Sequence, residues 1–134
     1  MQDYKSLMEK ANEMRKMSYA PYSRFRVGAV LVTKDGKEYT GCNFENASFP
    51  ASICAERSAF AKAISGGNRE FARIAIVGGR EGEISPFCAP CGVCRQVMSE
   101  FCGSDFEVVL GTPDNFKVFK FDEVLPMRFT GDEL

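Results

Sequence analysis

The sequence predicts a three-layer α/β/α fold, in which helices cover a mixed sheet of about five strands. Segments with apolar residues at helical spacing alternate along the chain with short β-branched runs that end at glycine turns. This alternation is the first observation behind the fold class, and it favours a sheet with both parallel and antiparallel pairs. The second is length, because 134 residues without repeat or linker suit one domain. We therefore expect a single domain over residues 1–134.

The first half of the chain is expected to form a helix, a hairpin and a second helix. Residues 4–17 have one apolar helical face, made of Leu7, Met8, Ala11, Met14 and Met17. Residues 27–33 are rich in β-branched side chains, a D-G turn follows at 34–37, and residues 38–43 return as the second strand. Residues 55–64 are strong helix formers that stop before two glycines.

The second half is expected to add three strands and two helices. Residues 74–77 are a short apolar run before a glycine pair, which is typical of a buried strand. Residues 91–101 predict a helix whose inward residues are Val93, Val97, Met98 and Phe101. Residues 107–110 and 117–120 predict two further strands, and residues 122–125 a brief helix that a proline ends.

The composition favours a globular protein that acts on a small molecule. The net charge is -1 and the basic residues are scattered, so we expect no nucleic-acid partner. No apolar run approaches the roughly 20 residues that cross a bilayer, and the first residues lack the apolar stretch of a signal peptide. We therefore expect a cytoplasmic location without membrane contact. The chain has no histidine, so acid–base chemistry must fall to other side chains.

The six cysteines indicate thiol or metal chemistry, because a cytoplasmic chain with this much core does not need disulfides. Cys88, Cys91 and Cys94 form a C-x-x-C-x-x-C ladder. A bacterial-type iron–sulfur loop would have its next cysteine at the position of Met98, which argues against a cluster. Pro90 separates Cys88, in a loop, from the two cysteines that follow in a helix.

A second chemical group stands at the start of the helix over residues 55–64. Cys91 and Cys94 are three apart and can bind one ion together, whereas Cys54 and Glu56 can converge only beyond the tip of their helix. The positive ends of both helices would favour thiolates. Three thiolates and one water would make a tetrahedral zinc site with an open position. Zinc lowers the pKa of its water from about 16 toward about 7, and Glu56 would then carry protons.

These residues also carry a resemblance to a known family. Cys54-Ala-Glu56 followed by Pro90-Cys91-x-x-Cys94 looks like the zinc nucleoside deaminase signature. The stretches YAPYSRFRVGAVL, GCNFENASFP, ICAER and PCGVCRQVMSEF resemble the small homotetrameric cytidine deaminases over almost the whole chain. The resemblance implies a cytidine deaminase-like fold, one zinc ion per subunit and a homotetramer. It also implies hydrolytic deamination of cytidine and deoxycytidine to uridine and deoxyuridine, with release of ammonia, in pyrimidine salvage.

The resemblance implies roles for the residues around the substrate. Phe25 would stack on the pyrimidine, and Asn43 and Glu45 would bind the ribose 3′-hydroxyl. Ala55 would also contact the substrate, and Phe129 would reach into the site of a neighbouring subunit. A carboxylate at the sugar accepts a hydrogen bond from a hydroxyl but repels a phosphate, so a free nucleoside is favoured over a nucleotide.

The charge of the predicted metal site suggests one more residue. Zinc with three thiolates has a formal charge of -1, which makes its bound water less acidic than at a site with a histidine. Arg57, next to Glu56, could offset this charge by donating hydrogen bonds to the ligand sulfurs, a role that the resemblance also implies. Arg95 is a second candidate.

Other interpretations of the same residues stay open at this point. The cysteines could be buried apolar residues, and Asn43 and Glu45 could belong to a turn at a strand end. A non-catalytic zinc module would use Cys88 as a fourth ligand, whereas a thiol oxidoreductase would use the C-x-x-C pair and leave Glu56 without a role. An aminohydrolase for another pyrimidine-like or guanidine substrate is the nearest enzymatic rival.

Overall fold

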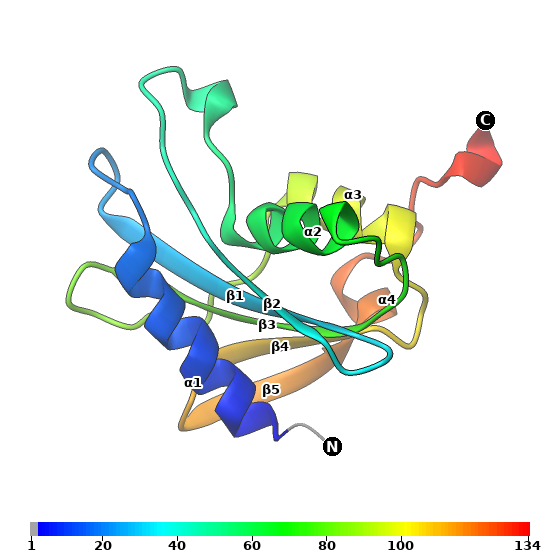
Figure 1. The fold of residues 1–134 in the computed structure, drawn as a ribbon, viewed down its shortest axis with the longest axis horizontal. Coiled ribbons are helices and arrows are strands. Elements are labelled where there is room, and N and C mark those ends of the chain that lie inside the picture. Colours follow the sequence, from blue (N-terminus) through cyan, green and yellow to red (C-terminus); the bar gives the residue numbers. More distant parts are fainter. Residues whose placement is uncertain (1–2) are drawn as a thin grey trace.

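The computed structural model describes residues 3–134. These residues form a five-stranded sheet in the order β2-β1-β3-β4-β5, with helices packed around it (Figure 1). The strands are β1 (Phe25–Thr33), β2 (Glu38–Cys42), β3 (Phe71–Arg80), β4 (Glu107–Thr112) and β5 (Asn115–Lys120). The pair β3 and β4 is parallel, and the other neighbouring pairs are antiparallel. The predicted mixed sheet is therefore confirmed.

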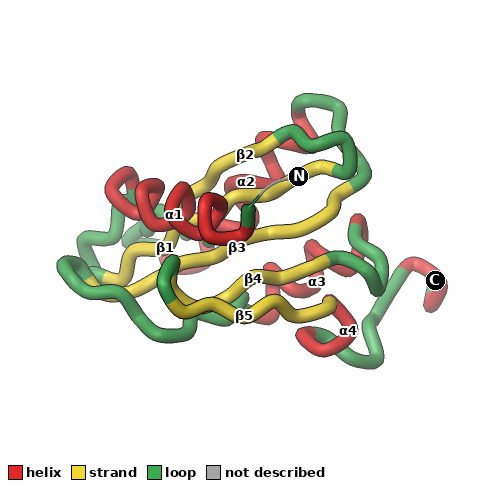
Figure 2. Tube along the Cα trace, turned by 90° about the horizontal axis from the view of Figure 1, so that it is seen from below, coloured by secondary structure: helices red, strands yellow, loops and turns green. Residues whose placement is uncertain are grey.

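Helices cover both faces of this sheet, as Figures 1 and 2 show from two directions. Helix α1 (Tyr4–Met14) lies on one face. On the other face lie α2 (Ala55–Ser65), α3 (Gly92–Phe101) and the short α4 (Phe121–Val124). Side chains alternate along β1, so that Val30 packs under α1 while Leu31 packs toward α2 and α3. None of the helices in residues 3–134 is long and apolar enough to cross a membrane.

Two side chains that the sequence pattern placed inward lie at the surface instead. Met17 is 69% exposed, because α1 ends at Met14 and the chain continues as a 3-10 turn that changes the direction of its side chains. Val93 is 57% exposed, because Cys94 takes the inward position in the first turn of α3. Both predictions of core packing were wrong, and both concern an end of a helix.

Strand β3 is longer than the predicted run at 74–77. Its glycine pair does not end the strand, because Gly78 and Gly79 continue the pairing with β1. A side chain at Gly78 would stand 2.5 Å from the Sγ of Cys88, and one at Gly79 would stand 2.7 Å from the Ser85 nitrogen. The glycines therefore serve close packing of the segment that leads to α3.

Glycines also let two strands approach helices closely. A side chain at Gly28 in β1 would overlap the carbonyl oxygen of Ala11 in α1. A side chain at Gly41 in β2 would overlap the carbonyl oxygen of Ala55 and stand 2.6 Å from the Ala59 nitrogen in α2. Gly41 thus sets the height of the first turn of α2 above the sheet.

Candidate active site

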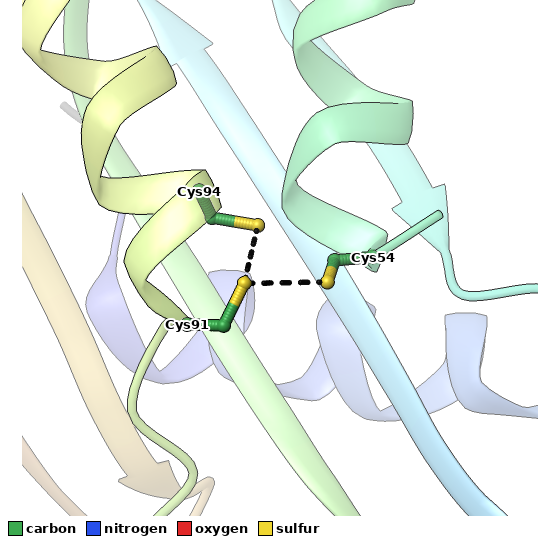
Figure 3. A group of neighbouring side chains, drawn as sticks. All are labelled: Cys54, Cys91 and Cys94. Atoms are coloured by element: carbon green, nitrogen blue, oxygen red, sulfur yellow. Dashed lines mark hydrogen bonds between the residues drawn. The ribbon is translucent and has the colours of Figure 1, made fainter. Parts of the chain in front are cut away.

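Three thiols from two helices meet on one side of the sheet (Figure 3). Cys54 is the N-cap of α2, Cys91 is the N-cap of α3, and Cys94 lies in the first turn of α3. The Cys91 sulfur lies 3.6 Å from that of Cys54 and 3.5 Å from that of Cys94. Ligand sulfurs of a tetrahedral zinc ion, each about 2.3 Å from the metal, stand about 3.8 Å apart. The donor type and the spacing of this cluster therefore fit zinc.

The electrostatics of the cluster favour a negative charge. Hydrogen bonds from Cys94, Arg57 and Cys91 hold the pKa of the Cys54 thiol well below its usual value. The pKa of Cys94 is raised, because its thiol donates to Cys54 and is buried. Neither helix start has a side-chain cap, and the positive end of a helix dipole favours a thiolate. The charge of the cluster therefore favours the binding of a cation.

Arg57 stands beside the cluster, as predicted. Its Nη2 donates to the Cys54 sulfur at 3.5 Å, and this contact raises the pKa of the guanidinium. Its Nε is buried without a hydrogen-bond partner in the described part of the chain. The second candidate, Arg95, donates instead to the carbonyl oxygens of Pro90 at 2.8 Å and Val124 at 2.6 Å. Arg95 therefore fixes the loop before α3 and supports no sulfur.

Glu56 is a buried carboxyl in the first turn of α2. It is 4% exposed, and burial raises its pKa to about 7, with a further rise from the charge of Cys54. A carboxyl that titrates near neutral pH can both accept and release a proton in one reaction cycle. The surroundings of Glu56 therefore give its carboxyl a pKa that suits the proton transfer expected of it.

A cavity of about 360 Å³ opens beside the thiols. Its lining includes eight residues with predicted roles: Phe25, Asn43, Glu45, Cys54, Ala55, Glu56, Arg57 and Cys91. Phe129 lies elsewhere, 59% exposed, with its carbonyl oxygen bound to the side chain of Gln96. A second cavity, of about 400 Å³ beside α1, is lined by none of the predicted residues. The cavity beside the thiols is therefore the candidate active site.

Asn43 faces the cavity and also holds the start of β1. Its Oδ1 accepts a hydrogen bond from the Val27 nitrogen at 2.8 Å, and its Nδ2 donates to the Phe25 carbonyl oxygen at 2.9 Å. A carboxamide has a second N–H and a second lone pair, so it can still bind a ligand. These two bonds give Asn43 a structural role at the start of β1, and that role is compatible with binding a ligand.

Glu45 likewise supports a turn while facing the cavity. Its Oε1 accepts from the backbone nitrogens of Tyr22 at 2.9 Å and Ser23 at 3.1 Å, and its Oε2 accepts from the Ser23 hydroxyl. The bond from this hydroxyl lowers the pKa of Glu45. Sequence reasoning missed Ser23, because a single serine in a turn carries no spacing signal.

Cys88, whose role the sequence left open, lines the cavity without joining the thiol cluster. Within residues 3–134, the group of potential metal ligands consists of the other three cysteines. Burial raises the pKa of the Cys88 thiol to about 11, so it is a neutral thiol at physiological pH. This arrangement gives no support to a closed site with four cysteines.

Comparison with known proteins places this site in a family. Residues 1–112 match the family model described as the cytidine and deoxycytidylate deaminase zinc-binding region. A cytidine deaminase of Sporosarcina psychrophila is 40% identical over 133 residues, which cover 98% of this chain and 95% of the relative. The chain belongs to the cytidine deaminase family. The thiol cluster and Glu56 lie inside the matched zinc-binding region.

The similarity to cytidine deaminases extends over nearly the whole chain. One from Halalkalibacterium halodurans is 41% identical, with 98% of each chain covered. The crystal structure of the cytidine deaminase from Burkholderia pseudomallei gives a TM-score of 0.86 at 46% identity, and the match covers 96% of this chain and 100% of that one. The predicted cytidine deaminase-like fold is therefore confirmed.

Proposed function

We propose that this chain is a zinc-dependent cytidine deaminase, which hydrolyses cytidine and deoxycytidine to uridine and deoxyuridine and releases ammonia. The observation that carries the proposal is the cluster of three thiols at a cavity, with the buried carboxyl of Glu56 beside it. Family membership agrees with this chemistry. The proposed unit is one catalytic domain over residues 1–134.

The proposed zinc ligands are Cys54, Cys91 and Cys94. Zinc enzymes typically use three protein ligands, whereas structural zinc sites use four. When bound, the ion supplies a Lewis acid that lowers the pKa of a water molecule toward neutrality. Arg57 donates to the Cys54 sulfur and so withdraws part of the negative charge of the thiolates.

Glu56 is the proposed proton carrier. Its carboxylate takes one proton from the attacking water and delivers it to the ring nitrogen; it then takes the remaining hydroxyl proton from the tetrahedral adduct at C4 and delivers it to the departing amino group. Its raised pKa keeps both protonation states accessible near neutral pH. One water is consumed and one ammonia is released, so Glu56 ends the cycle in the state in which it began.

Other residues that line the cavity would hold the nucleoside. Phe25 is placed to stack on the pyrimidine, and Asn43 and Glu45 to bind the sugar hydroxyl, while Ala55 lines the cavity beside the metal ligand Cys54. The pKa of Glu45 is lowered, so it is a carboxylate that would repel a phosphate. Free nucleosides are therefore the proposed substrates.

A homotetramer is also part of the proposal. Phe129 is exposed and lies outside the cavity of its own chain, which suits a residue that completes the site of a neighbouring subunit. The proposed location is the cytoplasm, where free thiols of this kind stay reduced. Sedimentation of wild type and Phe129→Ala, with activity measured on each, tests the shared site.

Incubation of the purified protein with cytidine tests the proposed activity. We expect an ultraviolet change and one ammonia per uridine from the wild type, and a rate lower by about 10²- to 10⁴-fold from Glu56→Gln with unchanged zinc content. Cytosine and cytidine monophosphate, run in parallel, test the preference for a nucleoside. The absence of ammonia from zinc-loaded wild type would refute the proposal.

A further inference from the structure

The turn that precedes β1 connects two residues that line the cavity through one hydroxyl. Ser23 Oγ donates to Glu45 Oε2 and accepts from the Phe25 nitrogen at 3.0 Å. Glu45 and Phe25 both line the cavity, whereas Ser23 is not among the lining residues. The hydroxyl thus lies behind the surface that a ligand would touch.

The backbone at this turn needs such support. Arg24, between Ser23 and Phe25, has a φ of 62°, a conformation that is unfavourable for a residue with a side chain. It persists only where the surroundings fix it. The Arg24 nitrogen donates to the Ala20 carbonyl oxygen at 3.0 Å, and Ser23 bonds on both sides of the strained residue. Loss of the hydroxyl would leave Phe25 and Glu45 with fewer constraints.

The carboxylate of Glu45 depends on this turn for its orientation. Its hydrogen bonds from Tyr22 and from the Ser23 nitrogen all reach Oε1, whereas the Ser23 hydroxyl is the protein donor that the structure gives to Oε2. Without that hydroxyl the carboxylate could rotate about its bonds to Oε1. A ligand hydroxyl would then meet a less ordered acceptor.

We propose that Ser23 is a positioning residue for nucleoside binding, whose hydroxyl fixes the Glu45 carboxylate and the start of β1 at Phe25 relative to each other. The inference rests on the proposed function, in which Glu45 contacts the sugar and Phe25 the base. Ser23 acts through these two residues and touches no substrate itself. The contacts to sugar and base are thereby set as one unit.

A comparison of two nucleosides tests this inference. For Ser23→Ala we expect the KM for cytidine to rise about tenfold, the size of one hydrogen bond, with little change in kcat. The rise should be smaller with 3′-deoxycytidine, which lacks the hydroxyl that Glu45 would bind. Ser23→Thr should restore the wild-type KM, because it keeps the hydroxyl. In a Glu45→Gln background, Ser23→Ala should cause little further rise in KM, because both substitutions disrupt the same interaction between Ser23 and Glu45.

The controls separate this inference from the proposed function. Ser104→Ala loses a hydroxyl that accepts from Arg128, outside the cavity, and should leave KM unchanged. An equal effect of Ser23→Ala on both nucleosides, additive with Glu45→Gln, would overturn the positioning role. If Ser23→Ala lacks the native circular dichroism spectrum, Ser23→Cys takes its place in the same measurements. Failure of the wild type to deaminate cytidine would refute the proposed function instead.

Discussion

Arg57 shows how one side chain can tune the predicted metal site. Its Nη2 donates to the Cys54 sulfur, and its buried Nε has no hydrogen-bond partner among the described residues. A hydrogen bond to a ligand sulfur draws electron density away from the metal, which makes a bound water more acidic. The charge of Arg57 is therefore expected to affect the rate more than the affinity for zinc.

Replacement of Arg57 by glutamine should leave about one zinc per chain but lower kcat by roughly 10- to 100-fold. Metal analysis and steady-state kinetics on the same preparation check this. Arg69→Gln is a suitable control, because Arg69 donates to carbonyl oxygens at an exposed position outside the cavity. An unchanged rate with full metal content would contradict the assigned role.

Cys88 makes a prediction about pH that does not depend on catalysis. Its thiol keeps its proton in the folded chain up to about pH 11, whereas a thiol in the unfolded chain loses it near pH 9. The unfolded chain therefore binds fewer protons between these values, and the free energy of unfolding should fall as the pH rises. Cys88 should contribute on the order of 1 to 2 kcal/mol to this fall.

Urea unfolding at pH 8.5 and pH 11 measures this contribution as a difference between two proteins. Wild type should lose more stability over this interval than Cys88→Ala, which has no thiol to titrate. The variant also loses packing against Gly78, but that loss is the same at both pH values. Equal losses in the two proteins would show that Cys88 is not buried as described.

The distance of helix α2 from the sheet depends on a glycine in the neighbouring strand β2. Gly41 in β2 lies against the first turn of α2, where Cys54 and Glu56 begin the helix. Gly28 in β1 plays the corresponding part under α1, on the face of the sheet away from the thiols. The same kind of contact thus serves the site in one case and only the fold in the other.

Gly41→Ala should therefore lower stability by about 1 to 3 kcal/mol and also weaken zinc binding, because it pushes the first turn of α2, which Cys54 caps, away from the sheet. Gly28→Ala should lower stability to a similar extent and leave zinc affinity unchanged. Gly92→Ala adds a methyl group in open space beside Cys91 and should be neutral or slightly stabilising. Thermal melts and competition for zinc with a chromophoric chelator distinguish the three variants, and equal zinc affinity in Gly41→Ala and Gly28→Ala would contradict this interpretation.

The sequence predicted the elements well where local signals agree with the tertiary structure. Helix formers before a glycine pair marked α2 to within one residue, and the D-G turn marked the β1–β2 hairpin. The glycine pair at 78 and 79 wrongly indicated the end of β3, because a strand in the middle of a sheet tolerates glycine when another segment packs against it. Such packing depends on residues distant in the sequence.

For the whole molecule, the predicted metal joins the two helices on one face of the sheet. Cys54 caps α2, and Cys91 and Cys94 lie at the start of α3, so a bound ion would connect the first turns of two helices that also pack on each other through Phe60 and Phe101. The sheet and α1 have a separate apolar core. Loss of the metal should therefore first destabilise the helical layer that contains α2 and α3.

Removal of zinc with a chelator should abolish activity and lower the melting temperature. At free zinc 1,000-fold above its dissociation constant, the ion adds about 4 kcal/mol to the stability of the folded state. Hydrogen exchange should increase at the starts of α2 and α3, while the amides shared by β1 and β3 stay protected. Cys94→Ser should resemble the metal-free wild type and respond little to chelator. Uniform exchange across the chain would contradict this order.

The candidate site was predictable in its chemistry but not in its shape. The cysteine spacing and the nearby Glu56 favour a zinc site over the other interpretations of these residues, because three thiols beside a carboxyl suit a zinc ion with an open position. The cavity depends on the turn before β1, where Arg24 adopts a conformation usually reserved for glycine or asparagine. The turn-like stretch at residues 19–23 predicts a turn but neither the strained backbone of Arg24 nor its contacts, so the double duty of Asn43 and Glu45 and the contribution of Ser23 emerge only in three dimensions.

The all-sulfur cluster also makes the protein vulnerable to oxidation. Cys91 is exposed and lies within 3.6 Å of both other sulfurs, so an oxidant that converts it to a sulfenic acid would find a partner thiol ready to condense into a disulfide. Each disulfide would remove two of the three proposed ligands at once. Thiophilic ions such as mercury or cadmium would compete for the same atoms. The feature that dispenses with histidine thus ties this activity to a reducing, heavy-metal-poor environment.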